Sequence, residues 1–313
     1  MRQVVQAGIL LLALSLIAAC TGTVAPTATP EPTTAPQVVE PAYTFGIAIS
    51  DLSNPFFATL VSGAQDAAER DGVAIVAVDA ANSAETQGEQ MATLIEQGVD
   101  ALLVNPVDSD AIVSAVEAAN TAGIPVFTVD RSANGGEIVA HIASDNLAGG
   151  RMAGDYLAEA ISEEGSVVEL KGIEGTSAAQ QRGAGFNEAI TAFPNITIIA
   201  AEIANFSREE GKTVFAAILE ANADIDGVFA HNDEMILGAI EAAREAERLA
   251  DIRFVGFDAV EDALAALESG DLLATIAQQP AEMGRLGVET AFAHLSGETV
   301  SADIPVDLAL ITR

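Results

Sequence analysis

The chain has few basic residues, few aromatic residues and almost no cysteine. Of its 313 residues, 13 are Lys or Arg and 46 are Asp or Glu, which gives a formal net charge of −33 at pH 7. Such a charge repels nucleic-acid phosphates and anionic lipid headgroups, so the composition excludes a protein that binds along a phosphate backbone. The single cysteine, Cys20, excludes a disulfide within the chain.

Several motifs of enzymes and nucleotide-binding proteins are also absent. The chain has no Gly-x-Gly-x-x-Gly, no Gly-x-x-x-x-Gly-Lys-Ser/Thr loop and no Gly-x-Ser-x-Gly elbow. The sequence therefore does not indicate a site for dinucleotides, for nucleoside triphosphates or for α/β-hydrolase chemistry. The three histidines, His141, His231 and His294, lack metal-ligand spacing. We predict structural roles for these histidines, and neither a cofactor nor a metal.

The first 41 residues do not have the pattern of a folded domain. Ala7–Ala19 is an apolar run too short to span a bilayer comfortably, and it is followed by Cys20. The residues around Cys20 resemble the lipobox of bacterial lipoproteins, and an ordinary secretory signal is the alternative. Residues 21–41 are rich in Pro and Thr, which is typical of a disordered tether. The sequence therefore predicts a signal peptide over residues 1–20, lipidation at Cys20 and an extracytoplasmic, membrane-anchored protein.

From residue 42 onward, short apolar runs alternate with stretches that have helical spacing, such as Pro55–Arg70. The first series of runs comprises Thr44–Ile49, Val73–Asp79, Ala101–Asn105, Pro125–Asp130 and Ile138–Ala143. The second series comprises Ser166–Leu170, Ile196–Glu202, Gly227–Ala230, Arg253–Phe257 and Leu273–Ala277. Strands that alternate with helices are typical of parallel sheets covered on both faces. Two such series predict an α/β protein with two similar, Rossmann-like domains.

Polar side chains follow the ends of apolar runs in both series. These residues are Asn54, Asn105, Asp130, Arg131, Asn232, Asp258 and Gln278. Taken singly, each is more simply a helix cap or a turn residue, and Asn54 before Pro55 has the pattern of an N-cap. In open α/β sheets, however, ligands bind beyond the carboxyl ends of the strands. We therefore predict that these residues together line a cleft.

Carboxylates, amides and a guanidinium suit an uncharged polyol. A carboxylate accepts from two vicinal hydroxyls, a guanidinium donates to two oxygens, and an amide does one of each. A sugar also has an apolar C–H face, which gains by packing against an aromatic ring. Phe56 and Phe57 follow the first run and are candidates for that ring. Phe56 is the stronger candidate, because Phe57 falls on the apolar stripe of the predicted helix.

Asp130 and Asp258 also have an alternative interpretation as the acid and base of a glycosidase. Arg131 follows Asp130 directly, and a guanidinium favours the ionised form of a neighbouring acid. The ionised form is the wrong one for a proton donor. We therefore predict a binding protein and not an enzyme.

The chain resembles the ribose-binding proteins, which are the substrate-binding components of bacterial ABC sugar importers. The resemblance runs from about Phe45 to Ile311. The motifs that carry it are Asn-Pro-Phe-Phe (54–57), Leu-Val-Asn-Pro-Val-Asp-Ser-Asp (103–110), Thr-Val-Asp-Arg (128–131), His-Ile-Ala-Ser-Asp-Asn (141–146), Gly-Thr-Ser-Ala-Ala-Gln-Gln-Arg-Gly (175–183), Asn-Asp-Glu-Met (232–235), Val-Gly-Phe-Asp (255–258) and Ala-Thr-Ile-Ala-Gln (274–278).

The resemblance implies a type I periplasmic binding protein fold with two lobes joined by a three-segment hinge. The N-terminal lobe is expected over 42–144 and 279–305, and the C-terminal lobe over 145–278 and 306–313. The crossovers are expected near 143–146, 277–280 and 303–306. Closure of the lobes around the ligand would then present the closed form to a membrane permease.

The resemblance also implies the ligand, D-ribose, and the residues that bind it. The matching positions are Asn54, Phe56, Phe57, Asn105, Asp130, Arg131, Arg182, Phe206, Asn232, Phe257, Asp258 and Gln278. Arg182 and Phe206 come from the resemblance alone. Ser53 departs from the family member used for comparison, which has Asn there.

Several alternatives remain open at the level of the sequence. The pocket could take allose, another pentose or autoinducer-2, and the protein could serve a sensor kinase or chemoreceptor instead of an importer. A sugar-responsive transcription regulator would need a helix-turn-helix before the fold and a basic face, both of which the sequence lacks. We expect a monomer whose permease and ATPase are separate chains.

Overall fold

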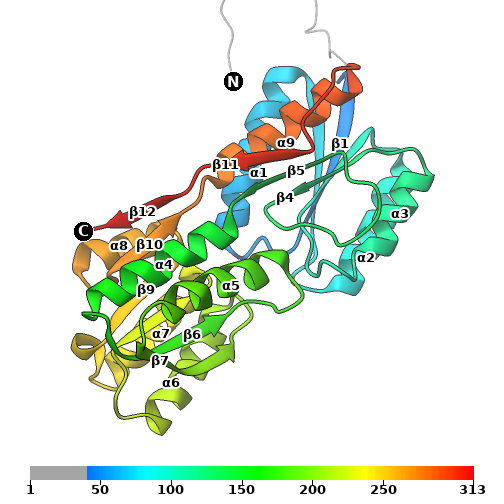
Figure 1. Cartoon of the computed structure of the whole chain (residues 1–313). Helices are drawn as coiled ribbons and strands as arrows, with labels where there is room; N and C mark the ends of the chain where they lie inside the picture. The colour runs from blue at the N-terminus through cyan, green and yellow to red at the C-terminus, as the bar shows by residue number, and fades with distance from the viewer. Residues whose placement is uncertain (1–40) are drawn as a thin grey trace, which may run out of the picture. The chain divides into compact units, whose positions relative to one another are not determined.

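The computed structural model describes residues 41–313 (Figure 1). The predicted signal peptide, the lipidation site Cys20 and the tether up to residue 40 lie outside the described residues. Within residues 41–313, no helix combines the length and the apolar character that crossing a bilayer requires. Two six-stranded sheets organise this part of the chain, and we call each sheet with its helices a lobe.

The first lobe is built on a fully parallel sheet with the strand order β11-β5-β4-β3-β1-β2. Its strands are β1 (Tyr43–Ile49), β2 (Val73–Asp79), β3 (Ala101–Val104), β4 (Val126–Val129), β5 (Ala140–Ser144) and β11 (Asp303–Val306). Its helices are α1 (Pro55–Asp71), α2 (Ala84–Gln97), α3 (Val113–Thr121) and α9 (Pro280–Leu295). Phe45 and Ile47 pack in one core cluster with α1 and α9, whereas Ala48 packs in another with α2 and α3. The helices therefore cover both faces of the sheet.

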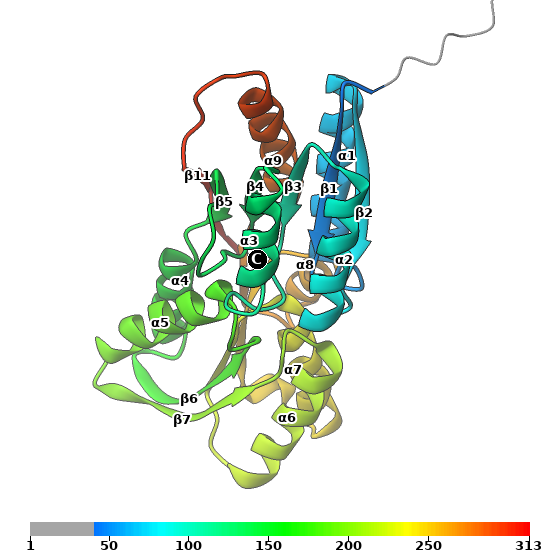
Figure 2. The same cartoon turned by 90° about the vertical axis from the view of Figure 1, so that its right-hand side faces the viewer.

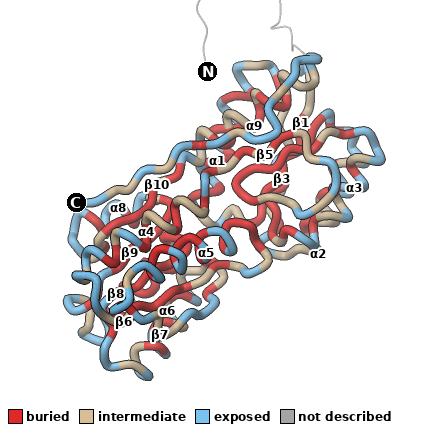
Figure 3. Tube along the Cα trace, in the orientation of Figure 1, coloured by how far each residue is buried: buried red, intermediate tan, exposed pale blue. Residues whose placement is uncertain are grey.

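The second lobe repeats this plan with the strand order β12-β10-β9-β8-β6-β7. Its strands are β6 (Glu164–Lys171), β7 (Asn195–Ile203), β8 (Gly227–Ala230), β9 (Arg253–Asp258), β10 (Ala274–Ala277) and the antiparallel β12 (Ala309–Thr312). Its helices are α4 (Asn146–Ala160), α5 (Ser177–Thr191), α6 (Arg208–Ala221), α7 (Asp233–Glu245), the 3₁₀ turn η1 (Leu249–Asp251) and α8 (Glu261–Ser269). Figure 2 shows the two lobes one above the other, and Figure 3 shows that the buried residues follow the strands and the inner faces of the helices.

The predicted α/β architecture with two parallel-dominated sheets is confirmed. The ten runs predicted from the sequence correspond to β1–β10, with ends that differ by a few residues. β11 and β12 were not among the predicted strands. Both are four residues long, lie at a sheet edge and alternate little between apolar and polar residues, and β11 contains Pro305.

Three chain segments cross between the lobes. They are the connections from β5 to α4, from β10 to α9 and from β11 to β12. The third differs from the predicted 303–306, because Val306 still pairs with Ser144 in the first sheet. This crossing therefore lies between Val306 and Ala309.

The lobes also touch through a group of serines, Ser109 and Ser132 of the first lobe and Ser177 of the second. The Ser109 N–H donates to the Gly175 carbonyl at 2.8 Å, and Ser109 Oγ accepts from the Ser177 N–H at 3.2 Å. Ser177 Oγ accepts in turn from the Ser132 N–H at 2.9 Å. A Cβ on Gly175 would lie 1.7 Å from Asp108 Oδ2, so a larger residue here would force the Asp108 side chain to move. The lobes are thus in direct hydrogen-bonded contact.

Candidate ligand-binding site

A small cavity lies between the carboxyl ends of the strands of the two sheets. Residues from both lobes line it: Asn54, Phe56, Phe57, Asp130, Arg131, Ala178, Arg182, Phe206, Asn232, Asp258 and Gln278. The list includes ten of the twelve predicted site residues, with Ala178 in addition. The free volume is only about 10 Å³, about the room that one water molecule needs. The side chains of the site therefore nearly fill it themselves.

The two remaining predicted residues, Asn105 and Phe257, lie directly behind the lining. Asn105 Oδ1 accepts from Ser50 Oγ at 2.6 Å, and its Nδ2 donates to Asp130 Oδ2 and to the Val129 carbonyl, both at 3.1 Å. The guanidinium carbon of Arg182 lies 3.9 Å from the centroid of the Phe257 ring. Both side chains are fully buried. They orient a carboxylate and a guanidinium that line the cavity.

Local backbone chemistry explains how Asn54 and Asn232 come to face the cavity. Asn54 is the N-cap of α1, where its Oδ1 accepts from the Phe56 N–H at 2.9 Å and Pro55 occupies the first helical position. Asn232 is the N-cap of α7, and its Oδ1 accepts from the Met235 N–H at 3.0 Å. These two residues therefore cap a helix and also line the cavity.

The aromatic rings of the site are arranged around Arg131. Phe56 and Phe57 are both buried and meet edge to face, with ring centroids 5.2 Å apart. The guanidinium carbon of Arg131 lies 5.1 Å from the centroid of the Phe57 ring and 5.0 Å from that of Phe206. Arg131 thereby contacts one ring from each lobe through cation–π interactions. Burial lowers the pKa of Arg131 to about 10, so it stays charged at neutral pH.

Arg182 joins the carboxylates of the two lobes. Its guanidinium lies 3.9 Å from Asp130 Oδ1 in the first lobe and 3.6 Å from Asp258 Oδ1 in the second. Its Nε donates to Asn146 Oδ1 and its Nη1 to the His231 carbonyl, both at 2.7 Å. Two buried arginines thus balance two buried aspartates, and the lining carries no large net charge.

Three buried polar atoms of the lining have no hydrogen-bond partner: Asp130 Oδ1, Arg131 Nε and Gln278 Oε1. Buried polar atoms in folded proteins are nearly always satisfied, so unpaired ones need an explanation. Here two acceptors and one donor, contributed by both lobes, meet at one cavity. The arrangement matches a ligand that offers both hydroxyl donors and oxygen acceptors.

The backbone is strained at three residues of the lining. The φ angles of Asp130, Phe206 and Asp258 are 62°, 60° and 116°, which residues with a Cβ rarely adopt. Such conformations persist only where the surrounding structure imposes them, and they cluster at functional sites. At these three positions the surrounding structure therefore holds the side chains in place at the cavity.

Burial raises the pKa of Asp258 from its ordinary value of 3.8 to about 7, although Arg182 and the hydrogen bond from Gln278 act in the opposite direction. In the fold this carboxyl group thus holds a proton over a pH range in which the unfolded chain has already lost it. Folding therefore takes up a proton between these two values.

We expect this proton to make the stability of the sugar-free protein depend on pH. The contribution of Asp258 to the free energy of unfolding is fully present below pH 3.8 and is lost as the pH rises through about 7. Urea unfolding of wild type and of Asp258→Asn across this range measures it, because the effects of the other acidic residues cancel in the difference. A difference in unfolding free energy that does not change with pH would contradict the assignment.

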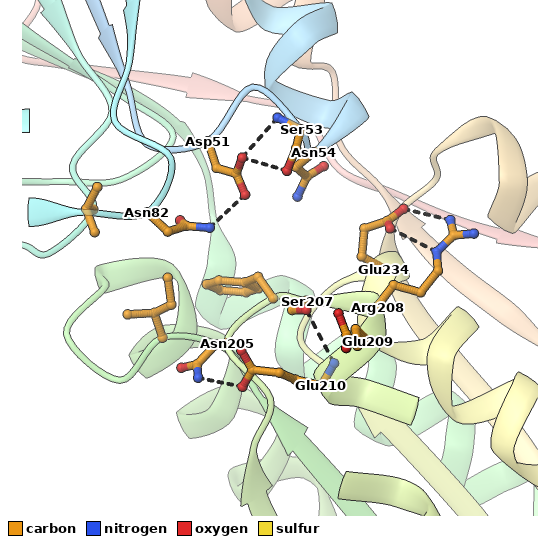
Figure 4. A pocket seen from close by; sticks show the side chains of 13 residues that line it. Asp51, Ser53, Asn54, Asn82, Asn205, Ser207, Arg208, Glu209, Glu210 and Glu234 are labelled. Carbon is orange, nitrogen blue, oxygen red and sulfur yellow. Dashed lines mark hydrogen bonds and ion pairs between the residues drawn. The ribbon is translucent and has the colours of Figure 1, made fainter. Parts of the chain in front are cut away.

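A larger pocket of about 570 Å³ adjoins the cavity and shares Asn54 and Phe206 with it (Figure 4). Asp51 and Asn82 line it from the first lobe and are hydrogen-bonded to each other at 2.7 Å. From the second lobe, Glu209, Glu210 and an Arg208–Glu234 pair line it, and Arg208 donates twice to Glu234 at 2.9 and 2.8 Å. Carboxylates outnumber cations here, so the pocket favours an uncharged ligand over an anion.

Reasoning from residue types alone did not identify Arg182, Phe206, Ala178 or Asn146. Arg182 lies in the interior of α5 and Phe206 in a loop, so neither follows the end of a strand. The only signal for these two was the resemblance to the ribose-binding proteins. Ala178 lies next to the N-cap region of α5, and Asn146 is the first residue of α4.

The chain is similar to known proteins over most of its length. Residues 45–299 match the model of the periplasmic binding protein domain family. The chain is 46% identical over 270 residues to the ribose import binding protein RbsB of Escherichia coli, which covers 86% of this chain and 90% of that protein. It is 43% identical over 271 residues to the protein of the same name from Bacillus subtilis, with coverage of 87% and 88%.

A solved structure shows the same fold. It is that of an ABC transporter periplasmic solute-binding protein from Actinobacillus succinogenes with bound D-allose. The TM-score is 0.82 at 29% sequence identity, and the match covers 86% of this chain and 97% of that one.

Proposed function

The chain belongs to the periplasmic binding protein family, and we propose that it captures D-ribose between its lobes and delivers the sugar to an ABC permease. We further propose that it works outside the cytoplasm, held to the membrane by a lipid on Cys20. The two curated relatives described above are ribose import binding proteins, and they are similar to this chain over most of their length.

One observation carries the proposal for the ligand. Asp130 Oδ1, Arg131 Nε and Gln278 Oε1 are buried without partners at one cavity, which Phe56, Phe57 and Phe206 also line. Hydroxyl groups of a sugar would satisfy these atoms, and its C–H face would lie against a phenyl ring. The near balance of two arginines and two aspartates suits an uncharged ligand.

Entry of the sugar requires the site to make room. A pentose has about ten heavy atoms, whereas the free volume is about 10 Å³. We infer that the lobes separate at the three crossings and that Arg131 leaves its place between the rings of Phe57 and Phe206. Because neither lobe contains the whole site, the ligand favours the closed arrangement and shifts the population towards it.

The remaining parts of the proposal concern partners. The permease and its ATPase are separate chains, and the protein acts as a monomer without a cofactor or enzymatic activity. Delivery to a chemoreceptor is an additional role for the same closed form. An extracytoplasmic location is consistent with membership of the family.

Calorimetric titration with a panel of sugars tests the ligand. We expect D-ribose to bind with micromolar or tighter affinity, which is within the bound of about −1.5 kcal/mol per heavy atom. D-Allose is the second candidate, because the similar solved structure holds that sugar. D-Arabinose and D-ribose 5-phosphate complete the panel, and the phosphate should be rejected by the acidic outer pocket. Binding of D-allose without binding of D-ribose would overturn the proposal for ribose.

A further inference from the structure

Asp233 is an acidic residue of the second lobe that is completely buried and does not line the cavity. It is the first residue of α7 and follows Asn232, which does line the cavity. Burial raises the pKa of Asp233 well above its ordinary value, and the negative charge of Asp258 raises it further. The ionised form of Asp233 is therefore electrostatically unfavourable at this place, and the hydrogen bonds that it accepts act in the opposite direction.

Those hydrogen bonds connect three separate strands or the turns that follow them. Asp233 Oδ2 accepts from the Val260 N–H at 2.9 Å, and Asp233 Oδ1 accepts from Thr275 Oγ1 at 2.8 Å. Val260 follows the end of β9 and Thr275 lies within β10, whereas Asp233 itself follows β8. One side chain thereby joins the end of β8, the turn after β9 and the body of β10.

Each of these strands has a residue of the cavity at or near its end. Asn232 directly precedes Asp233, Asp258 lies two residues before Val260, and Gln278 lies three residues after Thr275. Gln278 and Asp258 also bond to each other, Nε2 to Oδ1, at 2.8 Å. Asp233 therefore contacts segments within three residues of Asp258 and Gln278 and is itself adjacent to Asn232.

The turn that Asp233 holds is strained. Asp258 and Ala259 have φ angles of 116° and 58°, and the Ala259 N–H donates to Thr275 Oγ1 at 3.3 Å. A turn of this kind relaxes unless neighbouring groups hold it. Gly256 leaves the space for the carboxylate, because a Cβ there would lie 2.2 Å from Asp233 Oδ1.

We propose that Asp233 is a positioning residue that sets the second lobe's half of the binding site. Its carboxylate holds the strained turn at Asp258 in register with Asn232 and Gln278, so that the three side chains meet the ligand together. This proposal rests on the proposed function of the cavity, because it assumes that these residues bind a sugar.

The test compares Asp233→Asn with Glu169→Gln in the whole chain. Glu169 is a matched control, because it is also a buried carboxylate of the second lobe that accepts from two side chains, His231 at 2.9 Å and Asn187 at 3.0 Å. Both variants exchange a carboxylate for an amide and should lose similar amounts of stability. We expect D-ribose affinity to fall about tenfold or more in Asp233→Asn and to stay within about twofold of wild type in Glu169→Gln.

A second substitution separates positioning from general destabilisation. Glycine tolerates a positive φ without strain, so Ala259→Gly should relieve the turn. We expect Ala259→Gly alone to change affinity little and to restore about threefold or more of the affinity lost in Asp233→Asn. Equal affinity losses in Asp233→Asn and Glu169→Gln, or the absence of rescue by Ala259→Gly, would overturn the proposal.

Amide hydrogen exchange tests the positioning role independently of which sugar the protein binds. Without any ligand, exchange at Ala259 and Val260 should speed up in Asp233→Asn and stay unchanged in Glu169→Gln. If wild type binds another sugar of the panel, the proposed ligand is wrong and that sugar becomes the probe. Unchanged exchange at Ala259 and Val260 in Asp233→Asn would refute the positioning role whichever sugar binds.

Discussion

Asp258→Ala is expected to weaken D-ribose binding by about 2–5 kcal/mol, the range found when one member of a buried, hydrogen-bonded charged pair is truncated. Asp258 is buried, lies 3.6 Å from Arg182 and accepts from Gln278 at 2.8 Å. The substitution removes the acceptor that we propose for sugar hydroxyls, and it also leaves Arg182 without this carboxylate and Gln278 Nε2 without its acceptor. Calorimetric titration measures the loss as a lower affinity at an unchanged stoichiometry.

Glu268→Ala is the matched control for this prediction. Glu268 lies on α8 of the same lobe, is exposed and carries the same charge. Its removal should leave affinity unchanged, because a single exposed charge is screened by solvent. If Asp258→Ala bound D-ribose as tightly as Glu268→Ala did, the cavity described here would not be the binding site.

Arg182→Met is expected to lower the free energy of unfolding by about 3–5 kcal/mol, as when one partner of a buried ion pair is removed. Methionine keeps an apolar stem against Phe257 but provides no donor for Asn146 or for the His231 carbonyl. It also leaves Asp130 and Asp258 without the cation that lies between them. Urea unfolding of the sugar-free protein measures the loss, and D-ribose affinity should fall as well.

The pH dependence of this loss gives a further check. Arg182 lowers the pKa of Asp258, so its removal raises that pKa further; the loss should be smaller at acidic pH, where Asp258 is protonated in both proteins, than at alkaline pH. Arg151→Met is the control, because Arg151 pairs with Glu188 at the surface of the same lobe. An exposed pair contributes about 0–1 kcal/mol. Equal losses in the two variants would show that Arg182 has no special role.

Most strands could be predicted because each one is marked by a short stretch of its own sequence. Each buried strand is an apolar run between turn residues, and β8 begins and ends at the predicted residues. β11 and β12 are instead recognised only by their pairing at the edges of the sheets, β12 with β10 and β11 with β5. Their own residues carry little signal, so only the tertiary structure shows them.

The site was predictable to the extent that it follows strand ends. Asp130 and Asp258 could be proposed from position alone, because the carboxyl ends of parallel strands meet at one edge. Whether a side chain lines the cavity or lies behind it depends on packing, which separates Asp130 from Asn105. The contact of Arg131 with Phe57 and Phe206 depends on how closely the lobes approach, which no local pattern encodes.

The order of elements along the chain has a consequence for biosynthesis. The first lobe is completed by α9 and β11, which follow nearly all of the second lobe in the chain. α9 supplies Met283, Val288 and Ala291 to the core around β1 and α1. Domains generally fold as units once their residues have been made, so the first lobe cannot be completed before β6–β10 of the second lobe have been synthesised. The core of the first lobe therefore depends on residues that are synthesised only after most of the second lobe.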